Sequence, residues 1–149
     1  MELIFKIQKN IYNDMKGSYV LIAELKDDFS ISVGKKRKIK FYKGYYVYIG
    51  SAVNSLEKRI QRHLRDNKKM HWHIDYLLKY AIITDVFYKE STYKEECYIA
   101  KAFDENLMPI KSFGCSDCKC ESHLFYGSRD RIRRIINELE MHRFCNEKT

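Results

Sequence analysis

The sequence has little proline, little glycine and no long apolar run, and each absence excludes a class of protein. Of 149 residues one is proline and six are glycine, which excludes collagen-like and low-complexity chains. Nowhere do about 18 apolar residues follow one another, so we expect no membrane-spanning helix. The N-terminus lacks the charged start and apolar run of a signal peptide, so we expect a soluble, cytoplasmic protein.

Cysteines are few and unevenly spaced. The chain has five, an odd number, and three of them fall in the segment 115–120, which is unlike a secreted disulfide scaffold. We therefore expect reduced thiols. A zinc site made by Cys115, Cys118, Cys120 and His123 is an interpretation that we keep but do not favour, because the segment lacks two well-separated Cys-x-x-Cys pairs.

Positive charge is abundant. Lysine and arginine outnumber the acidic residues by 28 to 20, for a formal net charge of +8. Such a surplus favours polyanion partners, because lysine and arginine neutralise phosphates and release counterions, although it can also serve solubility alone. With 45% hydrophobic and 32% charged residues, the chain is globular, and its length predicts one domain.

The densest basic segment runs from Lys35 to Lys43 and contains Ile39, Phe41 and Tyr42 between its charges. This pattern suits an edge strand or hairpin that lies against phosphates. A lysine-rich sheet edge that prevents aggregation is the equal alternative. The candidate nucleic-acid contacts in this segment are Lys35, Lys36, Arg37, Lys38 and Lys40.

The most informative stretch is 45–65. Residues 45–49 are aromatic and β-branched, which predicts a strand, and Gly50 ends it. Asn54, with Glu57 three positions later, predicts the capped start of a helix.

That helix has a readable apolar face, formed by Leu56, Ile60 and Leu64. His63 falls within this stripe and Arg59 lies on its flank, so both side chains can reach a site at the edge of the packed face. The other basic residues, expected to point to solvent, are Lys58, Arg62 and Arg65; of these we take Arg62 and Arg65 as candidate nucleic-acid contacts.

Further elements follow from apolar periodicity. We expect strands at 18–25, 29–33, 82–89, 108–113 and 124–127, and helices at 71–80, 93–105 and about 128–143. The last helix has four arginines in its first half, among them Arg131, which is either a phosphate contact or part of a solvated face.

Glu96 is predicted to project into the apolar face of the helix 93–105, a face formed by Tyr93, Ile99, Ala100 and Phe103. An isolated buried carboxylate is costly unless it is paired or bound to a metal. Two explanations stay open, which are a divalent-metal ligand and a structural partner such as Arg59 or a tyrosine.

Several of these strings together resemble a known family. Tyr48-Ile49-Gly50, followed by Arg59-x-x-x-His63 and preceded by Gly17-Ser18-Tyr19, resembles the GIY-YIG nuclease domain. The strings 71–78 (HWHIDYLL) and 115–126 (CSDCKCESHLFY) are similar to its stand-alone, URI-type branch. Two departures are the serine in the first motif and a longer segment between the two motifs.

The resemblance implies an α/β (α+β) fold, with a small, mostly antiparallel sheet of three core strands plus additions, flanked by helices. One domain would cover 1–149, with its core at about 17–127. The implied function is metal-dependent hydrolysis of phosphodiester bonds in nucleic acid, with DNA as the expected target.

The resemblance also assigns roles. Tyr19 and Tyr48 would bind and activate water, and His63 would hydrogen-bond one of them. Glu96 would hold a single Mg²⁺ or Mn²⁺, and Arg59 would grip the phosphate. The segment 115–126 would line the cleft through Ser116, Asp117 and His123.

A non-catalytic nucleic-acid-binding module of the same fold is the rival hypothesis. The sequence leaves open whether the target is DNA or RNA, which structure is recognised, whether a partner protein supplies targeting, and the oligomeric state.

Overall fold

The computed structural model describes residues 15–34, 37–114 and 120–145. The strands are β1 (Gly17–Leu25), β2 (Phe29–Val33), β3 (Arg37–Phe41), β4 (Gly44–Ala52), β5 (Ile82–Glu90), β6 (Met108–Pro109), β7 (Leu124–Gly127) and β8 (His142–Arg143). The helices are α2 (Leu56–Leu64), α3 (His73–Leu77), α4 (Glu96–Asp104) and α5 (Arg129–Glu138). The chain is thus α+β.

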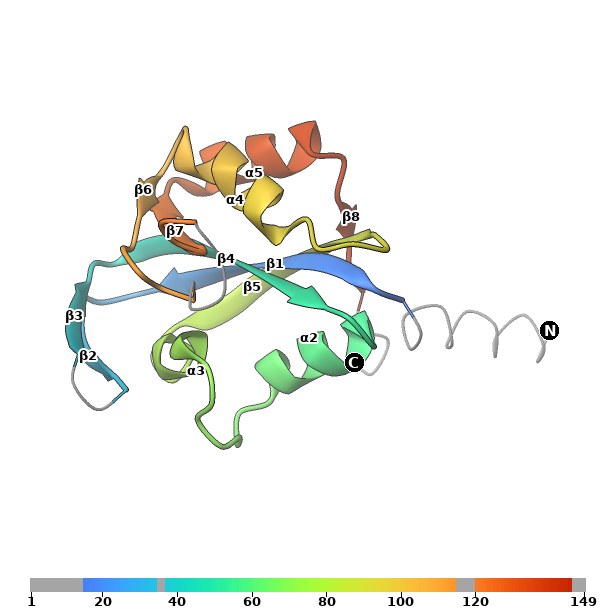
Figure 1. Cartoon of the computed structure of the whole chain (residues 1–149). Coiled ribbons are helices and arrows are strands. Elements are labelled where there is room, and N and C mark those ends of the chain that lie inside the picture. Colours follow the sequence, from blue (N-terminus) through green and yellow to red (C-terminus); the bar gives the residue numbers. More distant parts are fainter. Residues whose placement is uncertain (1–14, 35–36, 115–119, 146–149) are drawn as a thin grey trace.

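One six-stranded sheet organises the molecule, with the strand order β6-β7-β4-β1-β5-β8 (Figure 1). All strand pairs among the described residues are antiparallel, including the separate two-stranded sheet of β2 and β3. β1, β4 and β5 form the centre and have nine residues each. The mostly antiparallel sheet with three core strands and additions is confirmed.

Helices cover both faces of this sheet. α2 and α3 lie on one face and α4 and α5 on the other (Figure 1). β1 is therefore buried on both faces, which is why its sequence is apolar without alternation. Tyr19 and Leu21 join the core on the α2 side, whereas Val20 and Ile22 join the core on the α4 side.

The register of β1 and β4 determines which side chains share a face. Tyr19 pairs with Gly50, and Leu21 pairs with Tyr48. Because side chains alternate along a strand, Tyr19 and Tyr48 become diagonal neighbours on the α2 side of the sheet.

Four elements are shorter than the sequence predicted. The helix expected at 71–80 covers 73–77, and the one expected at 93–105 covers 96–104. The strand expected at 108–113 ends at Pro109, because the chain turns at Ser112 and Gly114, whose φ angles are 57° and 72°.

The C-terminal helix is also shorter than the predicted 128–143. It begins after Ser128, whose side chain caps it as expected, and ends at Glu138. Glu140 then takes a φ of 57°, which reverses the chain, and β8 pairs with β5. Within the described ranges, no helix is long and apolar enough to cross a membrane.

Candidate active site

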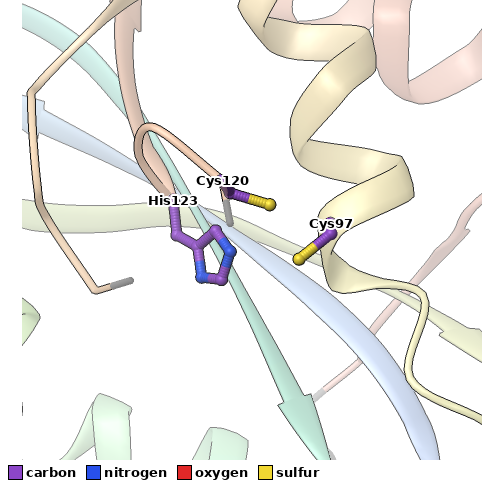
Figure 2. Close-up of side chains that lie close together, drawn as sticks. All are labelled: Cys97, Cys120 and His123. Atoms are coloured by element: carbon purple, nitrogen blue, oxygen red, sulfur yellow. The ribbon is translucent and has the colours of Figure 1, made fainter. Parts of the chain in front are cut away.

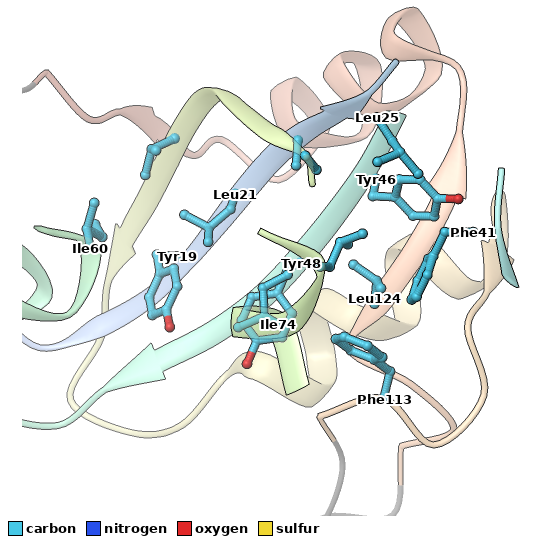
Figure 3. Close-up of a cluster of buried hydrophobic side chains, with 14 of the residues drawn as sticks. Tyr19, Leu21, Leu25, Phe41, Tyr46, Tyr48, Ile60, Ile74, Phe113 and Leu124 are labelled. Atoms are coloured by element: carbon cyan, nitrogen blue, oxygen red, sulfur yellow. The ribbon is translucent and has the colours of Figure 1, made fainter. Parts of the chain in front are cut away.

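A cleft of about 410 Å³ lies where the end of β4 and the start of β1 meet α2 and α4. Figure 3 shows the rings of Tyr19 and Tyr48 extending to the same side of the sheet. The residues that line the cleft are Tyr19, Tyr48, Ile49, Gly50, Ser51, Arg59, His71, Trp72, His73, Lys94, Glu96, Cys97, Gly114 and His123. Four of the five predicted catalytic residues are among them, and the fifth, His63, contacts Tyr19.

The position of the Tyr19 ring depends on a hydrogen bond of its hydroxyl group and on the absence of a side chain at Gly50. Its Oη lies 2.7 Å from Nε2 of His63. A Cβ atom at Gly50 would lie 2.3 Å from the same Oη, so the ring can cross Gly50 only because that residue has no side chain. Burial raises the pKa of Tyr19 well above its usual value, as does the neighbouring Tyr48, while the Arg59 guanidinium opposes this shift.

His63 lies on the buried face of α2, as the apolar stripe predicted. Burial lowers its pKa to about 3, so the imidazole is neutral at neutral pH. Its ring also stands edge-on to Tyr48, with 6.0 Å between the ring centroids. A neutral imidazole can accept the proton of one tyrosine hydroxyl through a hydrogen bond and hold that ring in place.

Arg59 lies at the edge of the cleft, on the flank of the same helix. One guanidinium nitrogen donates a hydrogen bond to the carbonyl oxygen of Ser51 at 3.2 Å. The guanidinium carbon also lies 4.6 Å from the centroid of the Trp72 ring. These contacts fix the plane of the guanidinium, which is the requirement for bidentate binding of a phosphate.

Arg62 does not point to solvent as the helical pattern predicted. It forms a two-pronged ion pair with the buried Asp75, with N–O distances of 3.1 and 2.9 Å. Its guanidinium carbon also lies 4.3 Å from the centroid of the Trp72 ring, the same ring that Arg59 contacts. The prediction for Arg62 was wrong because the periodicity of one helix does not reveal an ionic partner on another element, here Asp75 on α3.

Asp75 connects α2 to the segment before α3. Besides Arg62, its carboxylate accepts the backbone N–H groups of His71 and Trp72, both at 2.9 Å. Burial alone would raise the pKa of Asp75, but the hydrogen bonds from Arg62 and from these two amides lower it.

Asp75→Ala is expected to lower the free energy of unfolding by about 3 kcal/mol, because it removes the buried carboxylate that accepts from Arg62 and from two backbone amides. For a chain of this length the melting temperature should fall by roughly 6–12 °C. Scanning calorimetry checks this, with the exposed Asp27→Ala as the control. Because the folded pKa of Asp75 is lowered, its stabilisation is complete above the ordinary carboxyl pKa and is lost as the pH falls through the lowered value. Equal melting temperatures for both variants would contradict this role.

Glu96 is the first residue of α4 and is half-buried at the cleft. It does not lie in the middle of an apolar helix face as predicted, because Tyr93 precedes the helix and is 69% exposed. Among the described residues, none of the ion pairs joins Glu96 to Arg59. The carboxylate is therefore available to the cleft from the side opposite α2.

A hard divalent cation fits this position. Mg²⁺ in enzymes of phosphate chemistry is commonly held by one or two carboxylates and completed by water and substrate oxygens. Glu96 is the one carboxylate among the described residues that line the cleft. This single carboxylate could hold such a cation if water and substrate oxygens completed its coordination.

The segment 115–126 is described in part. Cys115, Ser116, Asp117 and Cys118 lie outside the described residues. His123 is buried and lines the cleft, as predicted. Burial lowers the pKa of His123, although the Glu96 carboxylate and a hydrogen bond with the Gly114 backbone act in the opposite direction.

Several lining residues were not singled out from the sequence as site residues. Trp72 supports two guanidinium groups, and His73 accepts a hydrogen bond from the Gly114 amide through Nδ1 at 3.4 Å. Lys94 adds a positive charge next to Glu96. The string 71–78 carried the signal for the first two, whereas no local pattern marks Lys94.

The predicted nucleic-acid contacts lie in three places. Lys38 and Lys40 are exposed on β3, whereas Lys35 and Lys36 fall outside the described residues. Arg65 is exposed at the end of α2. Arg131 is exposed on α5, on the other face of the sheet, and is hydrogen-bonded to the carbonyl of Asn106 at 3.4 Å.

Arg37 connects this basic strand to the cleft. Its guanidinium donates to the carbonyl oxygens of Lys111 and Ser112, which lie three and two positions before the cleft-lining Gly114. β3 is therefore attached to the segment that leads into one wall of the cleft.

Comparison with known proteins gives one match. A family model described as a domain of unknown function, DUF123, matches residues 18–144, which include all the cleft residues. No curated protein and no solved structure matches the chain.

Proposed function

The chain belongs to the DUF123 family, and from its cleft we propose that it is a metal-dependent endonuclease of the GIY-YIG type. It would hydrolyse phosphodiester bonds in nucleic acid, with DNA as the expected target. The observation that carries the proposal is the buried Tyr19–His63 hydrogen bond of 2.7 Å in a cleft that also presents Tyr48, Arg59 and Glu96. A structural core does not need two tyrosine hydroxyls, a guanidinium and a carboxylate at one opening.

The attacking water is bound by the two tyrosines. We assign the Tyr19 hydroxyl as the donor to the neutral His63, because burial keeps Tyr19 protonated. Its oxygen lone pairs then accept a hydrogen bond from the water. Tyr48, which is 8% exposed against 1% for Tyr19, would act as the general base in its phenolate form, taking one proton from the water as the water oxygen attacks the phosphorus.

Arg59 binds the non-bridging oxygens of the phosphate. Its plane is already fixed by Ser51 and Trp72, so charge that develops in the transition state meets a preorganised donor pair. Glu96 would hold the divalent cation, which supplies Lewis-acid stabilisation of the phosphate and of the leaving oxygen when bound.

The test is a cleavage assay on a panel of single-stranded, duplex, nicked and branched DNA and RNA substrates with Mg²⁺ or Mn²⁺. Cleavage of at least one substrate that requires the cation and is lost in Tyr48→Phe supports the proposal. Tyr45→Phe is the matched control, because Tyr45 precedes it on the same strand and packs against the other core. Binding without cleavage across the panel favours the rival hypothesis of a nucleic-acid-binding module.

Affinity for nucleic acid is expected to depend on Lys38 and Lys40. The two exposed lysines lie two positions apart and so share one face of β3. Each phosphate contact contributes about 0.9 to the slope of log affinity against log salt. The double alanine variant should therefore weaken binding and flatten that slope by up to about 2, measured by fluorescence anisotropy. The control variant Lys101→Ala, at an exposed position of α4, should leave the slope unchanged. An unchanged slope in the double variant would instead favour the alternative that the lysines of β3 only protect a sheet edge from aggregation.

A further inference from the structure

Three side chains that the proposed hydrolysis does not use come together at the cleft, and two of them, Cys97 and His123, line it. Cys97 extends from the first turn of α4, and Cys120 and His123 extend from the segment that leads into β7 (Figure 2). The two sulfur atoms and a ring nitrogen of His123 all lie within 4.8 Å of one another. His123 is buried and both cysteines are half-buried.

We propose that Cys97, Cys120 and His123 bind a zinc ion. Thiolate and imidazole are the donors that zinc takes in proteins, whereas Mg²⁺ takes oxygen. Zn–S bonds of about 2.3 Å and Zn–N bonds of about 2.0 Å in a tetrahedron place neighbouring donor atoms roughly 3.5–3.8 Å apart. The observed spacing of up to 4.8 Å is wider than this by at most roughly 1.0–1.3 Å, which side-chain rotations can remove.

Hydrogen bonds fix both the backbone and the ring of His123. Its backbone N–H donates to the carbonyl of Phe113 at 2.8 Å, and its carbonyl accepts the N–H of Ile49 at 2.9 Å. The ring is also hydrogen-bonded to the backbone of Gly114. A bond of this kind at one ring nitrogen fixes the orientation in which the other can coordinate the ion.

This ligand set differs from the one that the sequence offered. Cys97 lies far from the cysteine-rich segment in the chain and reaches it only through the packing of α4 against the sheet. Of the four residues in the sequence-based set, Cys120 and His123 belong to the cluster. Three protein ligands leave a fourth position on the ion, as in open zinc sites where water completes the shell.

Zinc at this place would fasten α4 to the segment before β7. Because Cys97 directly follows Glu96, the ion would also restrict the carboxylate proposed to hold the catalytic cation. That positioning role rests on the proposed function, whereas zinc binding by the three residues does not depend on it.

The experiment measures metal in the purified full-length protein, produced with added zinc and dialysed before plasma mass spectrometry. We expect about one zinc per chain in the native protein. Cys97→Ser and Cys120→Ser should each lose most of it, whereas Cys145→Ser, at an exposed position near β8, should keep it. Cobalt added to metal-depleted native protein should give sulfur-to-metal charge-transfer absorption, which is absent in Cys97→Ser.

Two results would overturn the proposal. One is a native protein that carries no zinc and gives no charge-transfer absorption with cobalt. The other is a folded Cys97→Ser variant with full zinc content, since the ion would then belong to other ligands. These measurements use no nucleic acid, so they stand apart from the cleavage assay, and a protein that binds zinc without cleaving any substrate would remove only the proposed nuclease function.

Discussion

Arg59→Lys is expected to keep nucleic-acid binding but to lose on the order of a hundredfold or more in single-turnover cleavage, the size seen when one preorganised donor is removed. Lysine preserves the charge, so attraction to phosphate changes little. It cannot reproduce the planar pair of donors that Ser51 and Trp72 hold in place. Rapid-mixing cleavage together with equilibrium binding separates the two effects.

Lys58→Ala and Arg65→Ala are the matched controls for this variant. Both residues are exposed on the same helix or at its end, so they should alter binding and its salt dependence but not the chemical step. Arg62 is unsuitable because its change would also break the Asp75 ion pair. Normal cleavage by Arg59→Lys would remove the guanidinium from the active-site model.

Glu96→Gln is expected to abolish metal-dependent cleavage while the protein stays folded and still binds nucleic acid. The amide keeps the shape of the side chain but loses the negative charge on which a hard cation depends. Since Glu96 is the carboxylate of the described cleft wall, raising the Mg²⁺ or Mn²⁺ concentration should restore little activity. The measurements are single-turnover rates over a metal titration, with circular dichroism as the check of folding.

Glu105→Gln serves as the control, because Glu105 caps the other end of α4 and is exposed. It should cleave like the native protein. Near-native cleavage by Glu96→Gln would end the assignment of this residue as metal ligand. A loss of folding in the same variant would instead mark Glu96 as a structural residue.

The strand part of the site follows from local patterns in the sequence. Alternation in a β strand decides which side chains share a face, so antiparallel pairing of β1 and β4 places Tyr19 and Tyr48 together. The position of His63 could be predicted equally well, because the stripe of Leu56, Ile60 and Leu64 fixes the buried face of the helix. These inferences need no more than the chain's own periodicity.

The N-cap residue of α2 could not be predicted from local patterns alone. Asn54 and Ser55 are adjacent, and both are favourable N-cap residues. The sequence predicted Asn54, but the cap is Ser55, whose Oγ accepts the Lys58 amide at 3.2 Å. Because asparagine and serine are about equally favourable N-caps, the start of the helix can move by one residue at little cost. Tertiary packing then determines where the helix begins.

Other contacts between distant elements could not be predicted from local patterns. Arg62 was assigned to solvent because helical periodicity says nothing of Asp75, which comes from another element. Cys97 was overlooked for the same reason, since its neighbours Cys120 and His123 belong to a segment that α4 meets only in the folded protein. Periodicity assigns a face to a residue, but it does not identify what lies opposite.

The pairing of Tyr19 with Gly50 also makes the proposed activity depend on the register of β1 against β4. A slip of one residue between β1 and β4 would turn every side chain of the displaced strand to the opposite face, and the two tyrosines would part to different layers. It would also place a side chain where the Tyr19 ring needs Gly50. A misregistered chain would therefore carry all the reactive groups of the proposed active site without their arrangement in one cleft.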